Sequence, residues 1–132
     1  MNDRKLKLIA FSGAVLCLLA VLIGAFGVHA FKEVLVANQR QGVFDLANRY
    51  QFYHGLALML IAALFANSSA KPKLGLSGGL MVLGTFVFCG SLYLLSLLNL
   101  PWLGAITPIG GVLLIIAWGL LAKTLLALGD QK

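Results

Sequence analysis

Charged residues are scarce in this sequence, and acidic residues are the scarcest. Only 11% of the 132 residues are charged, and only four of them are Asp or Glu. A soluble domain carries about a quarter charged residues, so a normal water-facing surface is excluded. None of the four acids lies inside a long apolar segment, and a carboxylate relay for protons across a membrane therefore has no carrier. The four are Asp3, Glu33, Asp45 and Asp130.

Motifs for catalysis, metal binding and nucleic-acid binding are also missing. The sequence has no HExxH, no Cys-x-x-Cys, no Walker-type glycine loop and no Ser-His-acid set. The two cysteines, Cys17 and Cys89, both lie in apolar segments, where buried apolar thiols are expected rather than a disulfide. The ten basic residues form no basic face. We therefore predict no catalytic residue, no metal, no cofactor and no nucleic-acid partner. An enzyme stays open as the less favoured alternative.

The apolar residues, 61% of the chain, are gathered into long blocks. A helix that crosses a bilayer needs about 20 such residues. The blocks predict an all-α membrane protein with a single domain, 1–132, folded as a compact antiparallel bundle. The first block follows a basic start, as a signal peptide would, but it exceeds the ~7–15 apolar residues of a signal sequence. We expect an uncleaved helix there. The four transmembrane helices are predicted at about 8–30, 50–66, 74–98 and 102–127.

Lysine and arginine are distributed unequally between the two sides of this predicted bundle. Seven lie on the side of the termini and three on the other side, which favours cytoplasmic N- and C-termini. The connection 31–49 is the longest on the opposite, outer side. Its apolar residues recur at roughly helical spacing, so it is predicted to be either a short amphipathic helix or a polar loop with a helical end. Gly42 weakens a continuous helix there.

Small residues recur at intervals of three and four along the first block. Lipid chains are as apolar as leucine, so close packing of small side chains must bring membrane helices together. The general abundance of glycine in membrane helices explains the number of these residues but not this spacing. The positions predicted to pack helices against each other are Gly13, Ala20, Gly24, Gly27, Gly84, Gly104 and Gly111.

Polar side chains of all four predicted helices are expected at one depth, just beneath the outer surface. This layer is either a ligand site or a hydrogen-bond network that fixes helix register. Two of its histidines, His29 and His54, meet the minimum requirement for axial haem ligands. However, His29 lies about 200° around the helix from Gly27, away from the small-residue seam. The layer consists of His29, Tyr50, Gln51, His54, Ser91, Tyr93 and Thr107.

Four motifs give the sequence a family resemblance. They read GAFGVHAFK at 24–32, YQFYHGLAL at 50–58, GSLYLL at 90–95 and LGAITPIGG at 103–111. With these motifs, the chain resembles the YgdD-like group of small bacterial inner-membrane proteins, a domain-of-unknown-function family with a eukaryotic transmembrane relative. The resemblance implies four transmembrane helices and a plasma-membrane location. It implies no reaction.

Three functions remain as hypotheses. The first is a non-enzymatic accessory, assembly or interaction protein that uses the lipid bilayer and a membrane-protein partner or a second copy. The second is a small transporter or channel component that acts as an oligomer. The third and least favoured is a haem- or quinone-binding membrane protein.

Overall fold

The computed structural model describes residues 3–66 and 71–129. Within these ranges the chain is helical and contains no strand, which confirms the predicted all-α class. There are four long helices and two short ones: α2 connects α1 to α3, and the 3-10 helix η1 connects α4 to α5. The elements in chain order are α1 (Asp3–His29), α2 (Lys32–Ala37), α3 (Gln41–Leu64), α4 (Lys71–Leu98), η1 (Pro101–Ala105) and α5 (Thr107–Gly129).

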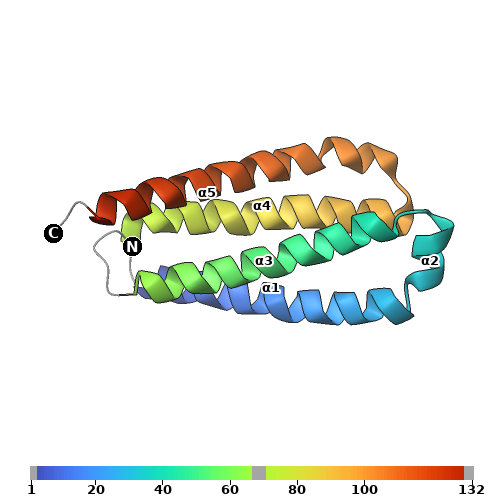
Figure 1. Ribbon diagram of the computed structural model, residues 1–132, viewed down its shortest axis with the longest axis horizontal. Coiled ribbons are helices and arrows are strands. Elements are labelled where there is room, and N and C mark those ends of the chain that lie inside the picture. The colour runs from blue at the N-terminus through green and yellow to red at the C-terminus, as the bar shows by residue number, and fades with distance from the viewer. Residues whose placement is uncertain (1–2, 67–70, 130–132) are drawn as a thin grey trace.

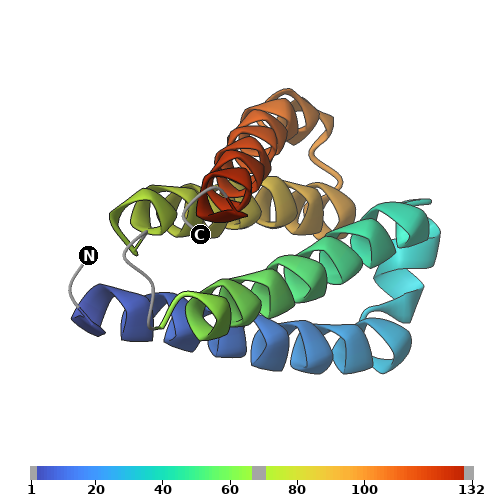
Figure 2. The same ribbon diagram turned by 60° about the vertical axis from the view of Figure 1, so that its left-hand side comes forward.

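The four long helices lie side by side with alternating directions (Figure 1). The start of α1 and the end of α5 lie at one end of the molecule, and α2 and η1 lie at the other. In the second view, α5 lies on α4, and α4 lies over the pair formed by α1 and α3 (Figure 2). Among the described residues, no Cα atom of α5 comes within 8 Å of one in α1 or α3. The predicted compact bundle is therefore more open than expected, because among the described residues α4 is the only long helix whose backbone α5 approaches closely, and α5 reaches α3 through side chains.

Among the described residues, three segments are long and apolar enough to cross a membrane: Asp3–His29, Leu74–Leu98 and Pro101–Ala127. The fourth long helix, α3, is not among them. It begins at Gln41, nine residues before the predicted start at residue 50, and its first turns contain Asp45 and Arg49. These charges lower the apolar character of α3. The structure thus gives three candidate spans where the sequence predicted four.

The predicted outer connection 31–49 divides between two helices. Only Lys32–Ala37 forms a separate helix, α2, and residues from Gln41 onward belong to α3. Gln39 has a φ of 56°, and the Gln39 and Arg40 amides donate to the Val36 and Leu35 carbonyls at 3.0 Å each. This is the Schellman pattern that ends a helix. Gly42 is inside α3, in open space.

Asn38, which ends α2, also holds the end of α4. Its side-chain Nδ2 donates to the Ser96 carbonyl at 3.0 Å and to the Leu97 carbonyl at 3.2 Å. The last carbonyls of a helix have no partner within the helix, so Asn38 supplies one. After α4 the chain turns at Asn99, whose φ is 50°, and enters η1. Helix α5 begins at Thr107, and one residue separates it from the end of η1.

Candidate functional site: the polar interior of the helices

Helices α1 and α3 approach most closely where two glycines face each other. A Cβ added to Gly13 would lie 2.6 Å from the Gly55 carbonyl oxygen, and one added to Gly55 would lie 2.8 Å from that of Gly13. Further along the same contact, the ring of Phe44 fills the space that a side chain at Gly27 would need. Cys17 is also at this interface, with its Sγ 3.7 Å from the Phe52 carbonyl. The small residues of α1 thus bring backbone against backbone.

Two amide side chains of α3 bind the backbone of α1 beside these glycines. Asn48 Nδ2 donates to the Ala20 carbonyl at 2.7 Å, and Gln51 Nε2 donates to the Leu16 carbonyl at 2.9 Å. Asn48 Nδ2 also donates to the Tyr93 hydroxyl on α4 at 3.2 Å. Asn48 therefore joins three helices, although the sequence analysis placed it in the outer connection. Its signal was present, because it precedes Gln51 by three residues and so shares a face with it on a helix.

His54 links α3 to α5. The indole Nε1 of Trp118 donates to His54 Nε2 at 3.1 Å, and His54 Nδ1 lies 2.7 Å from the Tyr50 carbonyl. Because an indole N–H can only donate, Nε2 must be the acceptor, and Nδ1 therefore carries the proton that it donates to Tyr50. Both ring nitrogens are engaged, so neither is free to coordinate a haem iron in this arrangement. Like Asn48, Trp118 belongs to this interior but was not predicted from the sequence.

Hydroxyl groups connect α4 to α5. Ser91 and Thr107 share a hydrogen bond of 2.7 Å between their hydroxyls, and Thr107 Oγ1 also donates to the Leu103 carbonyl at 3.3 Å. Nearer the end of the molecule where α1 starts and α5 ends, Ser77 Oγ donates to the Ala117 carbonyl at 2.7 Å. Each hydroxyl thus has an acceptor or a partner within this helix pair.

The seven residues of the predicted polar layer do not form one group. His29 is exposed at the end of α1. His54 lies about 20 Å along α3 from its first residue, by the ~1.5 Å rise of a helix, whereas Thr107 is the first residue of α5. Their hydrogen bonds instead form four separate sets: Tyr50, His54 and Trp118; Asn48 with Tyr93; Gln51 with the Leu16 carbonyl; and Ser91 with Thr107.

The tightest contact between α5 and α4 is at a glycine next to a predicted packing position. The close approach is at Gly110, where an added Cβ would clash with the backbone nitrogen of Phe88 on α4. At Gly104 and Gly111, the nearest atoms would be at 3.6 and 3.8 Å, which is ordinary contact. Gly104 and Gly111, predicted as helix-packing positions, thus face α4 at ordinary distances, and the tightest approach is at Gly110, beside Gly111. A Cβ added to Gly84 would lie 3.0 Å from the Leu114 side chain of α5.

The arrangement favours a structural use of these side chains over chemistry. Within residues 3–66 and 71–129, no group of three or more His, Cys, Asp or Glu side chains could hold a metal ion. The amides and hydroxyls described above bind carbonyls or one another, which is how a helix pair satisfies polar groups that lipid cannot. These hydrogen bonds join α3 to α1, α4 and α5, and α4 to α5.

Helical architecture, long apolar helices and a hydrogen-bonded interior define an all-helical membrane protein. The family described as "Protein of unknown function (DUF423)" matches residues 23–111. The UPF0382 membrane protein of Staphylococcus epidermidis is 40% identical over 113 residues, which cover 86% of this chain and 90% of that protein. UPF0382 membrane protein YwdK of Bacillus subtilis is also 40% identical, over 86% of this chain and 91% of its own length. No solved structure matches.

The chain therefore belongs to this family of bacterial membrane proteins of unknown function. That agrees with the resemblance seen in the four motifs, in that both give a membrane family without an assigned activity. The narrower YgdD-like grouping stays a prediction.

The hydrogen bond between Trp118 and His54 should make a measurable contribution to stability. We expect a double-mutant cycle of His54→Phe and Trp118→Phe to give a coupling free energy of about 0.6 kcal/mol, the average for hydrogen bonds between membrane helices. The measurement is the free energy of unfolding in mixed detergent micelles for the wild type, both single variants and the double variant. A coupling of zero would show that the two side chains are independent.

Proposed function

We propose that the chain crosses the membrane four times, with α3 as the fourth span and both termini in the cytoplasm. Helix α3 has 24 residues, enough for about 36 Å at ~1.5 Å per residue. The side chains of Asn48, Gln51 and His54 bind neighbouring helices. The C-terminal half of α3 therefore presents apolar side chains to the lipid, among them Leu56, Leu60 and Leu64. The excess of lysine and arginine on the side of the termini supports this orientation.

We further propose that the protein is non-enzymatic and acts by binding another membrane-spanning helix. The observation that carries this proposal is the paired state of the interior: His54, Gln51, Asn48, Ser91 and Thr107 each have a partner on another helix or on the backbone. A transporter needs polar groups along an open path, and a haem site needs a free histidine nitrogen. Neither hypothesis gains support of this kind.

The surface offered to a partner is the free face of α5. Helix α5 packs on α4 along one side, and its opposite side carries apolar and small residues at intervals of three and four. Ile115 and Leu126 are 72% and 76% exposed, and a Cβ added to Gly119 would meet nothing within 4 Å. This is the small-residue surface against which membrane helices pack. We define the free face of α5 as Val112, Ile115, Gly119, Ala122 and Leu126.

The test is purification in a mild detergent, followed by the mass of the particle and identification of the proteins in it. We expect an oligomer or a co-purifying membrane protein. Gly119→Ile should dissociate it, because the added side chain holds a partner helix away from α5. Gly79→Ile is the matched control, because Gly79 is also exposed with nothing within 4 Å, but on α4.

Two results would contradict the proposal. One is a wild-type particle that is strictly monomeric and free of partners. The other is an assembly that Gly119→Ile and Gly79→Ile affect equally, because then the free face of α5 has no special role.

A further inference from the structure

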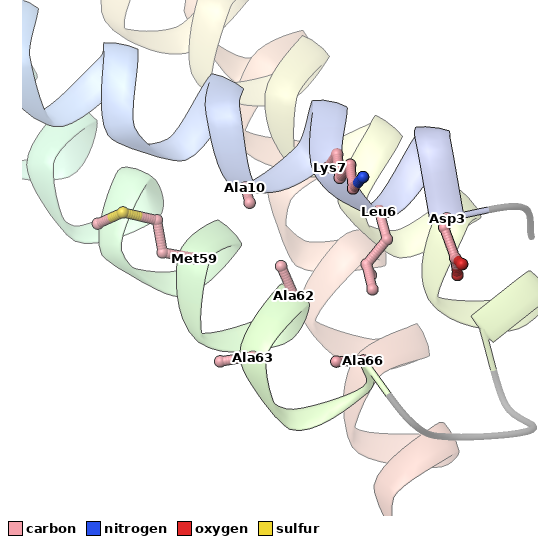
Figure 3. A pocket seen from close by; sticks show the side chains of 8 residues that line it. All are labelled: Asp3, Leu6, Lys7, Ala10, Met59, Ala62, Ala63 and Ala66. Atoms are coloured by element: carbon pink, nitrogen blue, oxygen red, sulfur yellow. The ribbon is translucent and has the colours of Figure 1, made fainter.

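A cavity of about 550 Å³ opens between α1 and α3 at the end of the molecule where α1 starts (Figure 3). It is within the ~300–1,000 Å³ range of ligand pockets. The first turns of α1 form one wall, and the last turns of α3 form the other. We call it the terminal wedge; its lining residues are Asp3, Leu6, Lys7, Ala10, Met59, Ala62, Ala63 and Ala66.

The wedge exists because of how the two helices pack. Their backbones touch at Gly13 and Gly55, and toward the start of α1 the side chains between them become single methyl groups. Four of the eight lining residues are alanine, and Figure 3 shows these short side chains along both walls. Alanine side chains fill little of the space between the two helices, so an apolar space is left open on the side of the molecule.

The chemistry of the wedge changes at its mouth. Deep in the wedge the walls are Leu6, Met59 and alanines, whereas Asp3 and Lys7 line the end near the helix terminus. Three basic residues, Arg4, Lys5 and Lys7, stand in this first turn and a half of α1 with Asp3 as the one acid. Because α1 is a candidate span, this basic cluster lies at the level of the lipid headgroups.

We propose that the terminal wedge binds one anionic phospholipid of the leaflet at this end. An acyl chain occupies the apolar part, and the headgroup phosphate lies against the ammonium group of Lys7. A basic pocket between membrane helices on the cytoplasmic side is the kind of site that holds anionic headgroups. The proposal needs α1 to span the membrane, but it does not depend on the partner-binding function proposed above.

The occupant follows from these two halves. A soluble polar ligand would find carbon on most of the wall and little to hydrogen-bond. A zwitterionic lipid such as phosphatidylcholine would fill the apolar part, but its quaternary ammonium gains nothing from Lys7 and meets an end of the chain where Lys and Arg outnumber Asp and Glu. Only an anionic lipid matches both the alanine walls and the excess of positive charge.

The experiment measures lipid retention by native mass spectrometry of the full chain in detergent. The two lipids offered are dioleoyl phosphatidylglycerol and dioleoyl phosphatidylcholine, at equal concentration. We expect the wild type to retain one phosphatidylglycerol in preference to phosphatidylcholine. Lys7→Gln should lower the phosphatidylglycerol occupancy ratio by about fivefold, the factor for ~1 kcal/mol from one lysine near an anionic membrane surface.

Matched variants separate a built site from general attraction. Lys5→Gln removes the same charge two residues away, from an exposed position outside the wedge, and should change retention less than Lys7→Gln. Ala63→Phe fills the wedge from its exposed wall and should abolish preferential retention. Ala25→Phe adds the same ring to an exposed position of α1 outside the wedge, and should leave retention unchanged.

Three results would overturn the proposal. Equal retention of the two lipids would make the wedge a nonspecific apolar crevice. Equal losses for Lys7→Gln and Lys5→Gln would reduce the effect to surface charge. Unchanged retention in Ala63→Phe would place the lipid elsewhere on the protein.

Discussion

Phe44→Ala is expected to destabilise the protein by about 3–5 kcal/mol, the range for removing a large buried aromatic ring. The Phe44 side chain is 2% exposed. Its ring occupies the space above Gly27 and meets the Tyr93 ring edge to face, with 5.2 Å between centroids. It also meets Phe31 at 6.2 Å. One residue of α3 therefore packs against α1, α4 and the connection to α2, and alanine would leave all three contacts empty.

The matched control is Phe86→Ala. Phe86 is on α4 and is 76% exposed, so in the membrane its ring exchanges protein contacts for lipid contacts at little cost. Both variants can be unfolded by titration with a denaturing detergent and followed by helix content. A loss in Phe86→Ala as large as that in Phe44→Ala would show that lipid-facing aromatic surface, rather than interior packing, holds the helices together.

The helices were largely predictable because a bilayer span must be a long apolar block. For α4, the predicted range 74–98 and the observed Lys71–Leu98 share their end, since Asn99 and Pro101 mark it in the sequence. For α3, the prediction failed at the start. Asp45, Asn48 and Arg49 look like a polar connection in the sequence, yet they lie on a continuous helix. Only tertiary structure shows that Asn48 is satisfied by Ala20 and Tyr93.

The polar residues of the interior could be named from the sequence, but their partners could not. Gln51 donates to the Leu16 carbonyl and Ser77 to the Ala117 carbonyl. Every residue has a backbone carbonyl, so the sequence does not show which one accepts a given hydrogen bond. The side-chain partner of His54 was hidden for a different reason. Trp118 is on an apolar helix, where a tryptophan is typical of a lipid-facing position, and nothing in its spacing connects it to a histidine 64 residues earlier.

Small-residue spacing indicates which helix faces pack, but not to the residue. On α1, the contacts of Gly13 and Gly27 with α3 lie on the seam that the spacing marks. On α5, the spacing of Gly104 and Gly111 suggested one face, and the tight contact is at Gly110 instead. One position rotates a side chain by about 100° around a helix. Gly104 is also in η1 rather than α5, so the two glycines do not share one helical face.

Gly110→Ala is expected to destabilise the packing of α5 by about 1–3 kcal/mol, the usual cost of adding a methyl group to a filled interface. The added Cβ would lie 2.7 Å from the Cα of Phe88. Backbone atoms cannot rotate away as a side chain can, so α4 and α5 would have to separate. Because no Cα atom of α5 lies within 8 Å of one in α1 or α3 among the described residues, α5 depends mainly on its packing against α4. The Trp118–His54 hydrogen bond should therefore weaken together with the α4–α5 contact.

Gly90→Ala provides the control for this prediction. Gly90 is on α4, two residues from Phe88, and a Cβ there would meet nothing within 4 Å. Alanine also favours a helix over glycine by roughly 0.5–1 kcal/mol, so Gly90→Ala should be neutral or stabilising. The measurements are the free energy of unfolding in micelles and the fluorescence of Trp118, recorded in a Trp102→Phe background. Equal stability of the Gly110→Ala and Gly90→Ala variants would mean that α5 is held mainly by contacts other than the Gly110–Phe88 approach.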